Sequence, residues 1–294
     1  MSRQTSANST SRIVLRSPAK LNLFLKVLNK RPDGFHDIVT VFERINLSDE
    51  LSFKSNRSGA FRIHCAHPHV PLGPKNLVYK AAQLLRKDFG IKAGADITIK
   101  KRIPVAAGLA GGSSNAATAL IGLNRLWRLR LSRKQLVSYA RKVGSDVAFF
   151  LHDCSWALGT QRGDEVRGLP IKARLWHILV VPRLKMYSWK VYGGLKLELT
   201  KKDDDATIFI HHLGKNHLDE IGRLLVNDLE EVIIRLSPNL ERLQQRLKSL
   251  NPKGVMISGS GPAVFGITET KKEAERIKKI LSRRFSQVFV VSTL

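Results

Sequence analysis

The chain has 294 residues, of which 43% are hydrophobic, so it can bury a substantial core; we expect two domains. Its formal net charge of +26, from 50 Lys and Arg against 24 Asp and Glu, is typical of proteins that bind nucleic acid, an acidic membrane surface or a highly phosphorylated small molecule. Apolar runs are shorter than the ~20 residues that span a bilayer, and Cys65 and Cys154 lack metal-ligand spacing; a membrane-spanning protein, a disulfide framework and a structural zinc site are therefore disfavoured.

The first twelve residues are rich in Ser, Thr and Arg and have no apolar core of a signal peptide. We expect them to form a disordered tail of a cytoplasmic protein. The two isolated cysteines fit a reducing compartment.

Basic residues are scattered along the sequence, for example at Lys100, Arg128 and Arg133 and from Lys271 to Arg284. They are not interleaved with aromatic residues, as they are in proteins that bind single-stranded nucleic acid. We therefore expect a basic, solvated surface without a specific nucleic-acid or membrane partner. A nucleic-acid-binding module stays open as an alternative that only the charge supports.

In chain order, residues 13–16 predict a short strand that Ser17-Pro18 breaks. Apolar residues then occupy every second position from 21 to 27, which is typical of a half-buried strand and puts Lys20 and Asn22 together on the opposite face. That face would ordinarily be solvated. However, Lys20 begins the strand directly after a Pro-Ala step, where a site would lie.

Residues 31–34 (Arg-Pro-Asp-Gly) predict a turn, because proline stands at the second position and glycine at the fourth. Strands over residues 38–42 and 45–53 follow, so the first part of the chain is predicted to form an antiparallel sheet. Between the turn and the strands, Phe35 and His36 would by default be a packing aromatic and a core or capping histidine.

A helix is predicted over residues 76–89 and a strand over residues 95–101. The strand leads into the most informative stretch, residues 104–115 (PVAAGLAGGSSN), which runs into a helix rich in Ala and Leu. Small residues let backbone amides approach a polyphosphate, and the positive end of the helix would face the same place. We interpret the stretch as an anion cradle. It matches neither a Walker A loop nor the dinucleotide-binding motif GxGxxG. The alternative, a tight loop before a buried helix with no ligand, therefore stays possible.

The helix after this loop buries one face from Ala116 to Trp127, and a second helix follows with Ser132 as its N-cap. Gly144 would end the second helix at positive φ, as many C-caps do. Asp146 would by default cap the next helix. Residues 157–165, which contain two glycines, predict a turn that closes the first domain.

From residue 175 the pattern is that of a split βαβ unit, with helices inserted over residues 188–236 and a polar loop at 201–205. The predicted elements are a strand (176–181), a helix (240–250), two strands (255–258 and 263–267), a helix (271–285) and a strand (288–291). The loop Gly259-Ser260-Gly261-Pro262 joins the two middle strands, and a hairpin turn alone would account for it.

Five segments carry a resemblance to a known family: Pro18–Leu23 (PAKLNL), Arg31–His36 (RPDGFH), Gly111–Ala117 (GGSSNAA), Gly144–Val147 (GSDV) and Asn227–Glu230 (NDLE). Together they resemble the GHMP kinase superfamily over nearly the whole chain, and most closely its members whose small-molecule substrate carries a cytidine diphosphate group. The resemblance implies an α+β fold of two domains. An N-terminal mixed α/β domain with a mostly antiparallel sheet would span residues 13–170, and a C-terminal ferredoxin-like split βαβ domain would span residues 171–294.

The resemblance also implies an ATP-dependent, Mg²⁺-dependent kinase. In the superfamily the glycine loop holds the phosphates of ATP, and here that loop would comprise Pro104, Val105, Ala106, Ala107, Gly108, Leu109, Ala110, Gly111, Gly112, Ser113 and Ser114. Ser114 would lie near Mg²⁺ and the β- and γ-phosphates. Lys20 and Asp146 match the catalytic pair: the aspartate would accept or orient the proton of the substrate hydroxyl, while the lysine would keep it ionised and stabilise the moving phosphoryl group.

Four further residues match substrate contacts of the superfamily: Asn22, Phe35, His36 and Tyr192. His36 would read the edge of a cytosine ring, Phe35 would stack on that ring where relatives often have Tyr, and Tyr192 would form the opposite stacking face. Residues 181–189 match the family pattern poorly, which weakens the assignment of Tyr192.

A second departure is that Ala106, Ala107 and Ala110 stand where the family usually has glycine; alanine fits there wherever φ is negative. The alternative within the superfamily is a kinase for another small alcohol, such as homoserine or mevalonate. The pair Phe35-His36 favours a cytidine ligand. The sequence leaves monomer and homodimer open.

Overall fold

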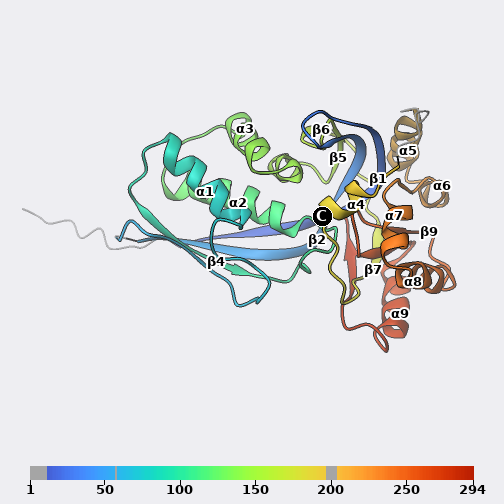
Figure 1. Cartoon of the computed structure of the whole chain (residues 1–294). Helices are drawn as coiled ribbons and strands as arrows, with labels where there is room; N and C mark the ends of the chain where they lie inside the picture. Colours follow the sequence, from blue (N-terminus) through green and yellow to red (C-terminus); the bar gives the residue numbers. More distant parts are fainter. Residues whose placement is uncertain (1–11, 57, 197–203) are drawn as a thin grey trace, which may run out of the picture.

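The computed structural model describes residues 12–56, 58–196 and 204–294 (Figure 1). The tail predicted for residues 1–12 therefore lies outside the described residues except for Arg12, and so does most of the polar loop predicted at 201–205. None of the helices in the described ranges is long and apolar enough to cross a membrane.

The first sheet is mostly antiparallel and is built around two long neighbouring strands. Its strands are β1 (Ile13–Lys30), β2 (His36–Asn56), β3 (Phe61–His64), β4 (Gly94–Lys100), β5 (Trp156–Thr160), β6 (Glu165–Gly168) and β8 (Val226–Asn227). The order is β3-β4-β2-β1-β8, and β5 pairs with both β2 and β6. Only the β1–β8 and β3–β4 pairs among these strands are parallel.

Two predicted strand breaks are wrong. Strand β1 runs through Ser17-Pro18, and the ladder with β2 slips in register between Pro18 and Ala19. Proline has no N–H to donate, and a bulge accommodates that loss without ending the strand. The strands predicted at 38–42 and 45–53 are one strand, β2, since both halves pair with β1. The first half pairs on its other edge with β5 and the second half with β4.

Helices α1 (Leu77–Asp88), α2 (Gly111–Leu126) and α3 (Arg133–Val143) cover one face of this sheet, as Figure 1 shows. The predicted N-cap of α3 is confirmed, since the Ser132 hydroxyl accepts from the N–H of Gln135 in a full capping box. The C-cap predicted at Gly144 is wrong in conformation: its φ of 175° is extended. A short 3₁₀ helix, η1 (Ser145–Leu151), begins directly after it.

The C-terminal half forms a second, antiparallel sheet in the order β11-β7-β10-β9, which confirms the split βαβ prediction. Its elements are β7 (Trp176–Val180), α8 (Asn239–Lys248), β9 (Gly254–Ile257), β10 (Val264–Thr268), α9 (Lys271–Leu281) and β11 (Val288–Ser292). The insertion contains α4 (Ser188–Gly193), α5 (Asp204–Lys215), α6 (Leu218–Arg223), strand β8 and α7 (Glu230–Leu236).

The two halves of the chain contact each other at several points. The domain boundary at 170/171 stays a prediction. Strand β8, which the sequence pattern missed, joins the first sheet beside β1 although it lies in the C-terminal half. Thr293 near the chain end pairs with Ile45 of β2. Between the sheets, His177 Nε2 lies 2.8 Å from Glu43 Oε2, with both side chains fully buried.

The turn predicted at 157–165 is a β-hairpin. The N–H of Gly163 donates to the carbonyl of Thr160 at 2.9 Å, as expected of a turn. The flanking residues, however, belong to β5 and β6 and extend the first sheet. The hairpin tip lies at the rim of the cavity described next.

Candidate active site

A cavity of about 940 Å³ lies where β1, the loop before α2, the start of η1, helix α4 and the loop after β9 converge. Almost all residues predicted for the site line it. They are Lys20, Asn22, Phe35, His36, Asp146, Tyr192, Pro104, Val105, Ala106, Ala107, Gly108, Ala110, Gly111, Gly112 and Ser113. Leu109 and Ser114, which were also predicted, are buried and do not line the cavity.

Lys20 and Asp146 approach each other in the middle of this cavity. Nζ of Lys20 on β1 lies 3.8 Å from Oδ2 of Asp146 in the first turn of η1. Only 5% of the lysine side chain is exposed, against 32% of the aspartate. Burial lowers the pKa of Lys20, and the nearby Asp146 opposes that shift without cancelling it. The site therefore holds a buried lysine, whose charged form is disfavoured by burial, beside a partly exposed carboxylate.

Asn22 confirms the alternation argument, because its side chain shares a face of β1 with Lys20 and accepts a hydrogen bond from Nζ. Its amide Nδ2 donates to Oγ1 of Thr40 at 2.7 Å, and that hydroxyl donates to the carbonyl of Phe24 at 2.7 Å. This chain fixes which way the Asn22 amide faces. Asn22 thus holds the lysine ammonium through its side-chain oxygen.

The loop 104–110 is held against the loop 258–262, for which a hairpin turn alone would have been a sufficient explanation. The Ser258 hydroxyl donates to the carbonyl of Gly108 at 3.2 Å, and the same hydroxyl accepts from the N–H of Asn22 at 3.3 Å. A Cβ on Gly108 would lie 2.1 Å from the carbonyl oxygen of Ser258. Glycine at 108 is therefore required by this contact, and Gly259 and Ser260 join the cavity wall.

Two alanines of the loop 104–110 adopt the left-handed conformation, with φ of 55° at Ala106 and 51° at Ala110. The condition under which alanine fits, a negative φ, is thus not met at either position. It is met at Ala107, which has no positive φ and is buried. Glycine would adopt both of these conformations without that strain.

Helix α2 begins at Gly111, earlier than the Ala-rich run indicated, so its free N-terminal amides open directly on the cavity. Ser113 lines the cavity, whereas Ser114 has no exposed surface and accepts a hydrogen bond from the Ser17 hydroxyl at 2.8 Å. The position near Mg²⁺ expected for Ser114 stays a prediction. Of the two neighbouring serines, Ser113 is the one that lines the cavity.

A buried carboxylate missed by the sequence reasoning holds both ends of the phosphate loop. Oδ1 of Asp49 accepts from the N–H groups of Arg102 and Ile103 at 2.7 and 2.9 Å. Its Oδ2 accepts from Asn115 Nδ2 at 2.9 Å and from the ammonium of Lys101. Asp49 is fully buried on β2, and the partners lie more than fifty residues away, so no local pattern signals it.

The far end of the cavity is aromatic. The rings of His36 and Tyr192 lie 5.3 Å apart at 31°, and Phe35 beside them is half-exposed. Burial, followed by the charge of Lys30, lowers the pKa of His36, so the imidazole is neutral near pH 7. Burial, followed by the charge of Asp146, raises the pKa of Tyr192, which stays a neutral phenol. Flat apolar faces with neutral polar edges suit a heterocyclic base.

Three features thus meet in one cavity: free backbone amides for an anion, a lysine–aspartate pair, and an aromatic end. Amides and a cation stabilise the charge of a moving phosphoryl group, and a carboxylate can receive or orient a hydroxyl proton. Among the described side chains, no group of three His, Cys, Asp or Glu residues is placed to hold a metal ion. The arrangement is suited to phosphoryl transfer to an alcohol.

Comparisons with known proteins agree with this geometry. The family model described as GHMP kinases N terminal domain matches residues 76–153, and the model described as GHMP kinases C terminal matches residues 209–287. The 4-diphosphocytidyl-2-C-methyl-D-erythritol kinase of Exiguobacterium sibiricum is 39% identical over 282 residues, covering 96% of this chain and 98% of that protein.

Solved structures give the same picture. A crystal structure of 4-(cytidine 5'-diphospho)-2C-methyl-D-erythritol kinase matches with a TM-score of 0.80 and 30% identity, over 95% of this chain and 98% of that one. A homoserine kinase from Cytophaga hutchinsonii matches with a TM-score of 0.72 at 19% identity, over 100% of this chain and 97% of that one. The second likeness shows the fold alone.

Proposed function

The chain belongs to the GHMP kinases and, among them, to the family of 4-diphosphocytidyl-2-C-methyl-D-erythritol kinases, and we propose how its cavity performs that reaction. It is an ATP-dependent kinase of isoprenoid precursor biosynthesis. The acceptor is the 2-hydroxyl of 4-diphosphocytidyl-2-C-methyl-D-erythritol. The observation that carries the proposal is the Lys20–Asp146 pair, which lies between the free amides of the phosphate loop and the aromatic end of the cavity.

Residues 104–113 would hold the phosphates of ATP, because the loop and the first turn of α2 line the cavity and the first N–H groups of a helix have no partner within it. The macrodipole of α2 adds partial positive charge at the same point. Ser113 supplies a hydroxyl donor there. The close contact of Gly108 with Ser258 holds the loop 104–110 in its conformation.

Asp146 accepts or orients the proton of the 2-hydroxyl as that oxygen attacks the γ-phosphate. Lys20 stabilises the charge that spreads over the transferred phosphoryl oxygens. Asn22 holds the ammonium of Lys20 in place through its own hydrogen bond. Because Asp146 is a third exposed within the cavity, an acceptor can reach it without movement of the chain.

Mg²⁺ fits this site as a companion of ATP rather than as a resident of a protein cage. Magnesium is commonly held by one or two carboxylates, substrate phosphates and water. Among the oxygen-bearing side chains that line the cavity, the carboxylate of Asp146 and the hydroxyl of Ser113 would be the ones to hold the ion. When bound, the ion would neutralise charge on the β- and γ-phosphates.

The cytidine group of the substrate occupies the aromatic end. Phe35 offers a half-exposed ring face, and His36 offers ring nitrogens for the base edge while remaining neutral. Tyr192, whose ring lies beside that of His36, would form the opposite stacking face. A homoserine or mevalonate molecule has no ring to stack on these side chains.

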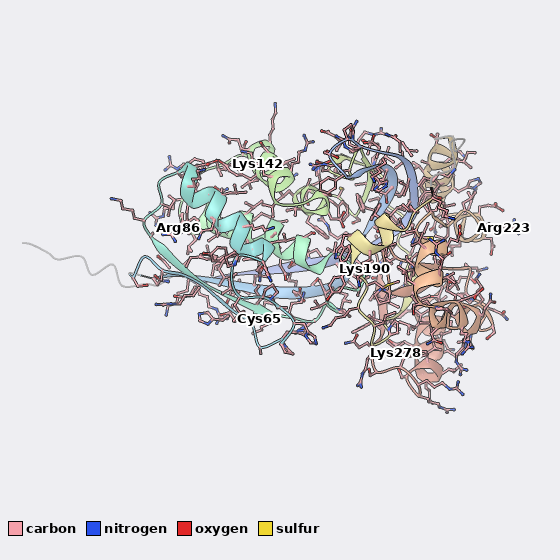
Figure 2. All side chains as sticks on the ribbon, in the orientation of Figure 1. Cys65, Arg86, Lys142, Lys190, Arg223 and Lys278 are labelled. Carbon is pink, nitrogen blue, oxygen red and sulfur yellow. The ribbon has the colours of Figure 1, made fainter. Side chains whose placement is uncertain are left out.

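A nucleic-acid partner is the other function class that the charge raised. Figure 2 labels Arg86, Lys142, Lys190, Arg223 and Lys278 on five helices spread from one end of the molecule to the other. This distribution favours a generally basic surface that attracts two polyanionic substrates. Binding to RNA that persists at moderate ionic strength would revive the alternative.

The experiment that tests the proposed substrate is competition by cytidine diphosphate. Cytidine diphosphate should bind the purified protein and inhibit turnover competitively against the alcohol substrate, whereas uridine diphosphate and ribose 5-phosphate should do so far more weakly. Equal inhibition by all three would remove the base from the recognition and favour a different alcohol.

A further inference from the structure

A guanidinium packs against the ring of Phe35 at the aromatic end of the cavity, and the mechanism above does not use it. Cζ of Arg162 lies 5.0 Å from the centroid of the Phe35 ring, and both residues line the cavity. Arg162 stands in the hairpin tip between β5 and β6, about 130 residues from Phe35 in sequence. The contact therefore joins two separate turns of the first sheet.

The arginine is held in place independently of the ring. Its Nη2 donates to Oδ2 of Asp164 at 2.6 Å, and Asp164 is only 7% exposed. The same hairpin is fixed to the Phe35 turn by Arg31, whose Nη1 donates to Oε1 of Gln161 at 2.7 Å. A guanidinium pinned by a buried carboxylate is a rigid support for an aromatic face.

The backbone of Phe35 is fixed by a different contact. Its N–H donates to Oδ1 of Asp33 at 3.1 Å, and this hydrogen bond is the largest cause of the lowered pKa of Asp33. The backbone is thus held by Asp33, while the ring is held by Arg162. Phe35 nevertheless remains 50% exposed and lines the cavity, so part of its surface is free to contact a ligand.

We propose that Arg162 is a positioning residue for the base of the substrate: held by Asp164, it covers one face of the Phe35 ring and leaves the other face to stack on a pyrimidine. The inference rests on the proposed function, because it needs a substrate with a base. The contact with the cation also fixes the orientation of the ring before the substrate binds. Less side-chain entropy is then lost on binding.

The variants that test it are Arg162→Met, which keeps an apolar stem and removes the cation, and Arg167→Met as a matched control. Arg167 lies on strand β6 of the same hairpin, is exposed and is not part of the cavity lining. Arg162→Met should raise the KM for the cytidylyl substrate and the Kd for cytidine diphosphate about three- to tenfold, the range expected of one cation–π contact. The KM for ATP and kcat should change less than twofold, and Arg167→Met should match the wild type.

A double-mutant cycle with Phe35→Leu shows whether Arg162 acts through the ring. In the Phe35→Leu background, Arg162→Met should add no further loss of affinity for cytidine diphosphate. An undiminished loss in that background, or no loss in the single variant, would overturn the inference while leaving the proposed function intact. If the wild-type protein itself fails to bind cytidine diphosphate, the proposed function falls and this inference falls with it.

Discussion

Nζ of Lys20 and Oδ2 of Asp146 lie 3.8 Å apart across the cavity, one on the first strand of the chain and the other in the first turn of η1. The separation is too long for a hydrogen bond and short enough for strong Coulomb attraction. The carboxylate therefore keeps free lone pairs for a third partner. A substrate hydroxyl is the partner that the reaction supplies.

Asp146→Asn should lower kcat by about 10²- to 10⁴-fold, the range for loss of a positioned proton acceptor. Asparagine preserves the size of the side chain, so the KM for ATP should change less than about threefold. Steady-state kinetics measure kcat and the KM for ATP, and calorimetric titration of an ATP analogue measures nucleotide binding separately. Near-normal kcat in the variant would remove Asp146 from its role.

Activity and stability should respond to pH in opposite directions because of Lys20. Burial lowers its pKa in the folded protein, so the catalytic cation is lost at a pH below the ordinary value of 10.5, and kcat should fall as pH rises through that lowered pKa. Between the lowered pKa and 10.5 the unfolded chain binds more protons at this residue, so its contribution to the free energy of unfolding rises with pH.

The variant Lys20→Met separates the two effects. It should be inactive, yet at neutral pH its Tm should exceed that of the wild type by a few degrees, since a penalised buried cation is removed and Asp146 remains partly solvated. Thermal unfolding of both proteins at pH 7 measures this. A lower Tm for Lys20→Met would show that the attraction of Asp146 outweighs the burial of the lysine.

The left-handed alanines of the phosphate loop predict a stabilising substitution. Ala106→Gly and Ala110→Gly should each raise the free energy of unfolding by about 0.5–1 kcal/mol, because relief of left-handed strain exceeds the added entropy of the unfolded chain. Ala107→Gly is the control, since it has no positive φ and should destabilise the protein. Denaturant unfolding of the three variants compares them. The same sign for all three would contradict the strain argument.

Substitutions in the buried pair Asp49–Lys101 should lower the free energy of unfolding by unequal amounts. Asp49→Ala leaves Lys101, 6% exposed, without its carboxylate and also frees the N–H groups of Arg102 and Ile103, so it should cost about 3–5 kcal/mol of stability. Lys101→Met should cost less, because three N–H donors still satisfy Asp49. Asp49→Asn should fall between them, as its oxygen can keep the two backbone contacts. Urea unfolding ranks the variants, and a larger loss for Lys101→Met would refute this order.

The features that the sequence predicted best are those written in local patterns. The common face of Lys20 and Asn22 follows from strand alternation, the Ser132 cap from side-chain chemistry, and the second sheet from the order of its elements. The resemblance brought Asp146 into the site, since its local context indicated only a helix cap. The catalytic and binding roles themselves stay predictions until they are measured.

What escaped prediction depends on contacts between distant segments. Strand β8 has only two residues and exists because β1 offers an open edge, and the register slip at Pro18 depends on its partner strand. The carbonyl of Ser258 that requires glycine at 108 lies 150 residues away in sequence. Asp49 lies in the middle of the strand predicted over residues 45–53, and nothing in that segment indicates its partners. Single-sequence patterns carry no information on such pairings.

The most direct test of the account is ADP release by the purified protein with Mg-ATP, comparing 4-diphosphocytidyl-2-C-methyl-D-erythritol with homoserine and mevalonate. The account predicts turnover with the cytidylyl substrate alone, and its loss in Asp146→Asn. Comparable turnover with either smaller alcohol, or no turnover with the cytidylyl substrate in a folded protein that binds ATP, would contradict it.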